Sequence, residues 1–326
     1  MAPAPDDHVA ASPSTTAKPA LVRARGLVKR FGDFAAVAGI DFEVRRGEAF
    51  GFLGPNGAGK TSAMRMIGCT SPVSAGELEV LGRDPATDGP AIRARLGVVP
   101  QLDNLDVDLT VEENLVIYGR YFGIPRKELA VKVDELLAFA QLTDRRHSKV
   151  DPLSGGMKRR LAISRALINE PELILLDEPT TGLDPQARHL LWERLWQLKS
   201  EGVSLLLTTH YMDEAEQLCD RLVIMDKGVI VDEGSPSALI ERHCPREVVE
   251  LRFRTDEEQV AATAAGAELG LRVESLRDRL LVYTDDGDAV VPKLEGAPGA
   301  VRSVLVRRAT LEDVFLTLTG RSLDEG

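Results

Sequence analysis

The chain has 326 residues, which suits two domains, and 44% of them are hydrophobic, enough for a sizeable buried core. Forty basic and 51 acidic residues leave a formal net charge of −11, which argues against nucleic acid as the main partner because phosphate neutralisation needs a basic surface. The three cysteines show no ligand spacing, so a disulfide framework and a zinc site are both disfavoured.

The start of the chain and its longest apolar runs bear on its location. Residues 1–20 are rich in Ala, Pro, Ser and Thr and contain no apolar stretch, so we expect a disordered tail and not a secretory signal. No apolar run approaches the roughly 18 residues that a membrane helix needs. We therefore expect a cytosolic protein whose role at a membrane would depend on a partner.

Strand-like and helix-like segments alternate from residue 21 to about residue 240. Strands are predicted in DFEVRRGEAFGFLG (41–54), RLGVVPQ (95–101), ELILLDEP (172–179) and VSLLLTTH (203–210). Helices are predicted in TSAMRMIGC (61–69), VEENLVIYGRYFG (111–123), RKELAVKVDELLAFAQL (126–142) and QARHLLWERLWQLKSEG (186–202). Strands that are apolar on both faces and alternate with helices indicate a mostly parallel sheet covered on two sides.

The pattern changes near residue 241, and residues 241–326 are predicted to form a small α+β accessory domain. Strands are expected in REVVELRFRT (246–255), RLLVYTDD (279–286) and VRSVLVRR (301–308), and a helix in DEEQVAATAAGAEL (256–269). A closing helix is expected in ATLEDVFLTLTG (309–320), with Thr310 as N-cap, Asp313 completing a capping box and Gly320 as the stop.

Residues 54–61, GPNGAGKT, match the phosphate-loop pattern G-x-x-x-x-G-K-S/T. The motif follows an apolar strand and precedes a helix, which is the context it needs; a plain glycine-rich turn is the alternative. Lys60 would reach the β- and γ-phosphates, and the Thr61 hydroxyl would be a ligand of Mg²⁺. We expect ATP to contact Gly54, Pro55, Asn56, Gly57, Ala58, Gly59, Lys60, Thr61 and Ser62.

Three other strands end in polar side chains. Asp177 follows LILL and would hold Mg²⁺ at the carboxyl edge of the sheet, and Glu178 would orient and polarise an attacking water. A solvated acidic pair is the alternative. His210 could bond the γ-phosphate, and Gln101 could touch both metal and water; each is weak alone, but both share the same place at a strand end.

A second anion site is indicated by LSGGMKRR, residues 153–160. Ser154 and two glycines precede a run that looks helical, and the first amides of a helix have no partners of their own. The Lys158–Arg159–Arg160 run is predicted to be a solvated helix face, since three charges are fewer than a usual nucleic-acid-binding tract.

With this motif, the order of the segments resembles the ATP-binding cassette (ABC) family over roughly residues 21–240: phosphate loop, Gln101, LSGG, Asp177–Glu178, GLD (182–184) and His210. The resemblance implies an α/β fold, a P-loop NTPase cassette with a mostly parallel sheet and a helical subdomain at about 102–168. In that family two copies pack head to tail. Ser154, Gly155 and Gly156 would therefore contact the γ-phosphate of the ATP that the other copy holds.

Further roles follow from position within the family pattern. Phe31 matches the aromatic residue that stacks on adenine, although a Phe without a supporting motif is more often part of a core. Asp184 matches the residue that links the two sites across the dimer, and Gln101 opens the segment that contacts the membrane partner. The fifth signature position is Met157, where the family usually has Gln, and a thioether cannot replace the hydrogen bonds of an amide.

The segments VVPQLDNLDVDLTVEENL, GRYFGI and LEDVFLTLTGR look like those of the ATPase subunit of the nodulation-factor exporters. The resemblance implies ATP and Mg²⁺ as cofactors, a homodimer, a separate integral-membrane permease of the ABC-2 type, and a peripheral place on the cytoplasmic side of the inner membrane. The expected cargo is a lipo-chitooligosaccharide. Alternatives are a related drug or polysaccharide exporter, or a soluble non-transport ABC ATPase, which would usually carry two cassettes in tandem or a long coiled coil.

Overall fold

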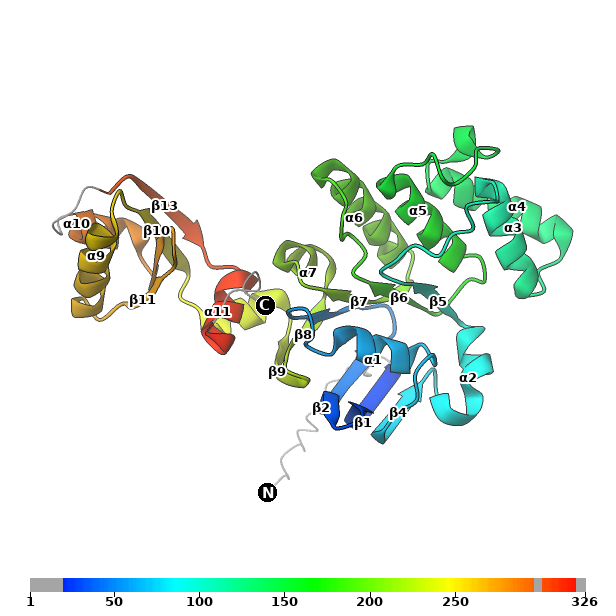
Figure 1. Cartoon of the computed structure of the whole chain (residues 1–326), viewed down its shortest axis with the longest axis horizontal. Coiled ribbons are helices and arrows are strands. Elements are labelled where there is room, and N and C mark those ends of the chain that lie inside the picture. The colour runs from blue at the N-terminus through cyan, green and yellow to red at the C-terminus, as the bar shows by residue number, and fades with distance from the viewer. Residues whose placement is uncertain (1–19, 296–300, 321–326) are drawn as a thin grey trace, which may run out of the picture.

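The computed structural model describes residues 20–295 and 301–320, and its centre is a six-stranded sheet in the order β5-β6-β7-β3-β8-β9 (Figure 1). The first five strands in this order are parallel, and β9 closes one edge in the antiparallel sense. The strands are β3 (Ala49–Leu53), β5 (Leu96–Val99), β6 (Leu173–Asp177), β7 (Ser204–Thr209), β8 (Arg221–Asp226) and β9 (Val229–Gly234). The predicted α/β fold with a mostly parallel sheet is confirmed.

Both faces of this sheet are buried, and alternate residues of one strand belong to different cores. Ile174 and Leu176 of β6 pack in one apolar cluster, whereas Leu173 and Leu175 pack in another. The surrounding helices are α1 (Lys60–Ile67), α2 (Pro85–Arg93), α6 (Pro185–Ser200), α7 (Met212–Leu218) and α8 (Pro236–His243). The carboxyl ends of the parallel strands therefore meet at one edge, where the predicted polar residues lie.

A separate antiparallel sheet, β2-β1-β4, packs against the core on the α1 side. It consists of β1 (Ala20–Phe31), β2 (Phe34–Arg45) and β4 (Ala75–Val80). Residues 1–19, which make up nearly all of the predicted tail, lie outside the described residues, and Ala20 is the first residue of β1. The sequence did not predict β1 or β4, because charged residues and bulges interrupt their alternation.

Three helices form a region of their own at one end of the molecule (Figure 1). They are α3 (Val111–Tyr121), α4 (Arg126–Phe139) and α5 (Gly155–Ala166), with a short 3₁₀ turn at Thr143–Arg145. They share an apolar cluster that includes Leu115, Leu137 and Leu161. Because α5 also packs against β5, this region is joined to the β5 edge of the central sheet.

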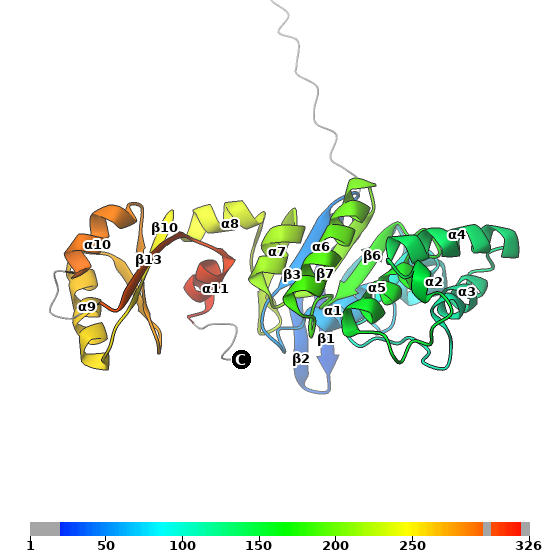
Figure 2. The same ribbon diagram turned by 90° about the horizontal axis from the view of Figure 1, so that it is seen from above.

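The C-terminal residues form a four-stranded antiparallel sheet in the order β11-β12-β10-β13. In chain order the elements are β10 (Glu247–Arg252), α9 (Asp256–Glu268), β11 (Arg272–Ser275), β12 (Leu280–Thr284), α10 (Gly287–Glu295) and β13 (Ser303–Arg308). This βαββαβ succession is the ferredoxin-like arrangement. Helices α9 and α10 pack on one face of the sheet (Figure 2).

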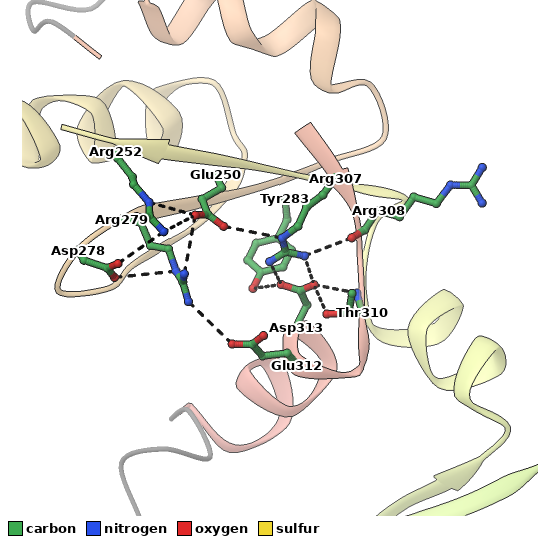
Figure 3. A network of polar contacts seen from close by, with 10 residues as sticks. All are labelled: Glu250, Arg252, Asp278, Arg279, Tyr283, Arg307, Arg308, Thr310, Glu312 and Asp313. Carbon is green, nitrogen blue, oxygen red and sulfur yellow. Dashed lines mark hydrogen bonds and ion pairs between the residues drawn. The ribbon is translucent and has the colours of Figure 1, made fainter. Parts of the chain in front are cut away.

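Helix α11 (Leu311–Thr319) lies between this small sheet and the cassette (Figures 1 and 2). Phe315 is fully buried in a cluster that also contains Leu218 of α7, Leu239 of α8 and Tyr283 of β12. Near the N-terminus of α11, Asp313 accepts hydrogen bonds from Arg307 and Tyr283 (Figure 3). The capping box predicted at Thr310 and Asp313, and the stop at Gly320, are both confirmed.

Among the described residues, no helix is long and apolar enough to cross a membrane.

Candidate functional site

The phosphate-loop motif joins the end of β3 to the start of α1. Gly59 has φ +104° and a side chain there would lie 2.3 Å from the Ala36 carbonyl, so only glycine fits. A Cβ at Gly54 would lie 2.2 Å from the Met225 carbonyl. The loop is therefore packed so closely on β2 and β8 that its backbone amides, and not side chains, form its surface.

Lys60 is buried at the base of the loop. Its Nζ donates to the carbonyls of Gly54 (2.6 Å) and Pro55 (3.0 Å) and lies 3.8 Å from Glu178 Oε1. Burial lowers the pKa of Lys60, and the charges of Glu178 and Asp177 oppose that effect. The ammonium thus lies between the loop and the two carboxylates, a position from which it could bind a phosphate held by the loop.

Asp177, at the end of β6, accepts hydrogen bonds from two hydroxyl groups. Thr208 Oγ1 donates to Asp177 Oδ1 at 2.6 Å and Thr61 Oγ1 at 3.2 Å. Magnesium in nucleotide sites is commonly held by one or two protein oxygens together with phosphates and water. The Thr61 and Asp177 oxygens fit such an ion. Thr208 was missed from the sequence because one threonine in a buried strand carries no pattern of its own.

Glu178 lies at the centre of the predicted catalytic group. Its Oε2 accepts from Gln101 Nε2 (3.0 Å) and from Thr181 Oγ1 (3.1 Å), and its Oε1 lies 3.3 Å from His210 Nδ1. The close approach of His210, helped by the charge of Lys60, lowers the pKa of Glu178. The ends of β5 and β7 thus bring Gln101 and His210 to the carboxylate at the end of β6, which is held ionised and able to accept a proton.

A cavity of about 490 Å³ is lined by the phosphate loop and by two aromatic side chains, Phe31 and Phe34. Phe31 and Phe34 are 55% and 65% exposed, so neither is part of a core. Gln101 and Glu178 also line the cavity. The predicted base-stacking residue Phe31 is placed at the mouth of the phosphate site. Phe34 was not predicted, although it stands three residues further along the same hairpin.

The residues of the signature segment lie apart from this cavity. Ser154 is the N-cap of α5 and accepts from the Met157 amide (3.3 Å), and Asp184 is the N-cap of α6. Ser154 and Gly155 are exposed, and Gly156 is half-buried against Ala187. Among the described residues that line the phosphate-loop cavity, none comes from Ser154–Gly156. The two helix starts that the sequence predicts to bind anions therefore occupy different places on the same chain.

The prediction that Lys158–Arg159–Arg160 is a solvated helix face is wrong. Arg159 is buried, and Arg160, half-buried, donates through Nε to the Ala140 carbonyl (2.8 Å). Arg159 donates to backbone carbonyls at the ends of β5 and β6. Burial lowers the pKa of Arg159. The run of charges was misinterpreted because a guanidinium can be buried when backbone carbonyls and a carboxylate accept from its donors.

Comparison with known proteins finds matches to both parts of the chain. The family model described as ABC transporter matches residues 37–181, and the model described as the C-terminal domain of nodulation factor export protein NodI matches residues 258–320. A solved dimeric ATP-binding cassette in a post-hydrolysis state, bound to ADP and Pi, is 27% identical with a TM-score of 0.61, covering 66% of this chain and 98% of that one. A solved ATP-binding subunit of an ABC transporter is 31% identical with a TM-score of 0.62, covering 68% and 92%.

The fold and the matches to known proteins define the class of protein: a nucleotide-binding cassette that hydrolyses ATP for a transporter. Two curated relatives, each called Nod factor export ATP-binding protein I, match almost end to end. The protein of Rhizobium sp. (strain N33) is 47% identical over 92% of this chain and 97% of its own length, and that of Cupriavidus metallidurans is 48% identical over 93% and 99%. The chain belongs to the ABC transporter family of ATP-binding subunits that includes these proteins.

Proposed function

We propose that two copies of this chain pair head to tail and enclose two ATP molecules, each between the phosphate loop of one copy and Ser154–Gly156 of the other. The observation that carries this proposal is the separation of the two helix starts within one chain. The α5 amides behind Ser154 are presented outward, where a phosphate brought by a second copy can meet them. A dimeric cassette among the solved relatives supports the pairing.

Each side chain of the site has a step to perform in this arrangement. Lys60 and the loop amides would bind the β- and γ-phosphates, while Thr61 and Asp177 would hold Mg²⁺, which neutralises phosphate charge when bound. Glu178 would accept a proton from the attacking water, and Gln101 and His210 would orient its carboxylate from two sides. Depressing the pKa of Glu178 keeps it ionised at neutral pH.

The transport step requires a partner. We propose a separate integral-membrane permease of the ABC-2 type, with this subunit bound peripherally at the cytoplasmic side of the inner membrane. Closing of the pair around ATP and reopening after hydrolysis would shift the permease between two states. Nucleic acid is not expected to bind, given the net charge of −11.

For the cargo, we propose a lipo-chitooligosaccharide of the Nod-factor kind. The support is the end-to-end likeness to the Nod factor export proteins, including the match over the C-terminal domain. A drug or polysaccharide exporter is the alternative, because the ATPase does not itself hold the cargo. ATP turnover in proteoliposomes with the co-purified permease distinguishes these cargoes. We expect lipo-chitooligosaccharide to raise the turnover, and chitin oligomers without the acyl chain to leave it unchanged.

The pairing is tested with Glu178→Gln, which keeps the shape of the site but removes the proton acceptor. We expect this variant to form a stable dimer with ATP during size-exclusion chromatography and to hydrolyse almost none of it. Lys60→Ala in the same background is the control, and it should remain monomeric. A Glu178→Gln chain that stays monomeric at high protein concentration and saturating Mg·ATP would contradict the head-to-tail arrangement.

A further inference from the structure

Arg159 connects α5 with two loops of the nucleotide site. Its side chain is about 5% exposed, and its five N–H donors face five acceptors. Four acceptors are backbone carbonyls: Pro100 (2.5 Å), Asp177 (2.9 Å), Glu178 (3.2 Å) and Pro179 (2.8 Å). The fifth is Asp103 Oδ1 at 3.4 Å. One planar group therefore holds both the end of β6 and the segment after β5.

The backbone that Arg159 holds is strained at Glu178. This residue has φ +44°, in the left-handed region, which is a strained conformation for a non-glycine residue. Arg159 bonds the carbonyls of Glu178 and of both its chain neighbours. From the other side, the Glu178 amide donates to the carbonyl (3.1 Å) and hydroxyl (3.0 Å) of Thr208. The strained peptide is thus clamped between α5 and β7.

The same guanidinium also fixes Gln101, the second residue of the catalytic group. Arg159 donates to the carbonyl of Pro100, the residue directly before Gln101. The side chain of Gln101 in turn donates through Nε2 to Glu178 Oε2 at 3.0 Å. Arg159 lies five residues after Ser154, in the helix whose start would receive the partner's phosphate. Any displacement of α5 is therefore passed through a single rigid group to the backbone of Glu178 and Gln101.

We propose that Arg159 is a positioning residue for hydrolysis: it holds Glu178 in its left-handed conformation and ties Gln101 to it, so that engagement of α5 by a second copy sets the carboxylate for attack. The last step rests on the proposed head-to-tail pairing, whereas the positioning of Glu178 does not. A purely structural role would make the variant less stable but leave the turnover of its folded fraction unchanged.

The test compares Arg159→Gln and Arg159→Lys with Lys158→Gln, a control on the same helix whose ammonium has no hydrogen bond or ion pair among the described residues. Turnover and KM are measured at a temperature where circular dichroism shows each chain folded, and ATP affinity by calorimetry. We expect kcat of Arg159→Gln to fall about 100-fold while the Kd for ATP stays within about 3-fold, because none of the hydrogen bonds of Arg159 goes to a phosphate-loop residue. Arg159→Lys keeps the charge but reaches fewer carbonyls, so its kcat should fall about 10-fold.

Three outcomes would overturn the proposal. These are a kcat for folded Arg159→Gln within about 2-fold of wild type, a loss as large in Lys158→Gln, and a rise in Kd that matches the fall in kcat. The proposed pairing is judged separately by the Glu178→Gln dimer. That dimer could fail to form while Arg159→Gln still loses turnover at unchanged Kd. This result would support the positioning role of Arg159 and contradict its coupling to a second copy.

Discussion

Glu216 Oε1 accepts the backbone N–H of Leu311 at 2.7 Å, so the first turn of α11 is bonded to α7, the helix that begins two residues after His210. Burial raises the pKa of Glu216. Helix α11 is in turn fixed to the small C-terminal sheet through Asp313 (Figure 3). The accessory domain is therefore joined to the catalytic cassette by a shared core and by polar contacts, which gives it a route to influence the cassette.

Asp313→Ala should destabilise this junction strongly. Asp313 is fully buried and accepts from Arg307 Nη1 (2.7 Å), Arg307 Nη2 (3.0 Å) and the Thr310 amide (2.8 Å). Removing Asp313 takes two acceptors from the partly buried Arg307 guanidinium and leaves the Thr310 amide without its bond, which costs about 3 kcal/mol. We expect a lower urea midpoint and faster hydrogen exchange at the α11 amides.

Glu312→Ala is the matched control, one residue away on the same helix. Its carboxylate is about half exposed and only approaches Arg279 at 4.0 Å, a surface pair that contributes about 0–1 kcal/mol. A urea midpoint for Asp313→Ala no lower than that of Glu312→Ala would show that the network in Figure 3 does not hold α11 in place.

Glu214→Gln should stabilise the protein at alkaline pH. Glu214 is fully buried in α7, its Oε1 accepts from Trp192 Nε1 (3.4 Å), and burial raises its pKa despite the nearby charge of Arg159. A carboxyl group whose pKa is higher in the folded than in the unfolded chain favours folding when protonated. Its contribution is fully present below the unfolded pKa and is lost as pH rises through the folded pKa.

The melting temperature measures this effect. Between pH 5 and pH 8 the wild type should lose more stability than Glu214→Gln, and the variant should melt higher at pH 8. Glu201→Gln, at an exposed position, should leave the pH profile unchanged. Parallel profiles for wild type and Glu214→Gln would mean that Glu214 does not titrate differently in the two states.

The phosphate loop, Asp177, Glu178 and His210 could be predicted from the sequence for a specific reason. Each stands at the end of an apolar run, and parallel strands present their carboxyl ends at one edge of the sheet. The parallel core followed from the same runs, because strands buried on both faces have no polar alternation to obscure them.

Arg159 and Glu214 could not be recognised in this way. Both are charged residues on helices, where the usual expectation is exposure to solvent, and both are buried by segments distant in the chain. Whether a charge can be buried depends on which carbonyls and donors surround it, and no local pattern reports that. The left-handed conformation of Glu178 is hidden for the same reason, since its stabilising partners, Arg159 and Thr208, come from other elements.

Phe31→Ala should weaken ATP binding by about 10-fold through loss of stacking on the base, which is typically worth about 1–3 kcal/mol. Phe31→Tyr should stay near wild type, because it keeps the aromatic face. Calorimetry with ATP and with pyrophosphate separates the effects: pyrophosphate has no base, so its affinity should be unchanged. Equal losses for the two ligands would indicate that Phe31 supports the loop and does not contact adenine.

Gly155→Asp tests whether the signature glycine serves the fold or a partner. Gly155 does not have a positive φ, and the nearest atom to an added Cβ is Leu183 Cδ2 at 3.8 Å, so the fold tolerates a side chain there. An acidic residue in the first turn of α5 also suits the helix dipole. We therefore expect Gly155→Asp to melt close to wild type, yet to lose hydrolysis because its carboxylate would repel a phosphate.

Mixing Gly155→Asp with a phosphate-loop variant tests whether Gly155 serves the ATP of its own copy or that of the other copy. Lys60→Ala should also be inactive, since it lacks the ammonium at the phosphate loop. If each site takes Lys60 from one copy and Gly155 from the other, a heterodimer of the two variants contains one intact site and one doubly impaired site. An equimolar mixture should then regain activity that neither variant has alone, approaching a quarter of the wild-type rate if the copies pair at random and the sites act independently. If both residues served the same ATP within one chain, no mixture could recover activity, and the absence of any recovery would contradict the trans arrangement.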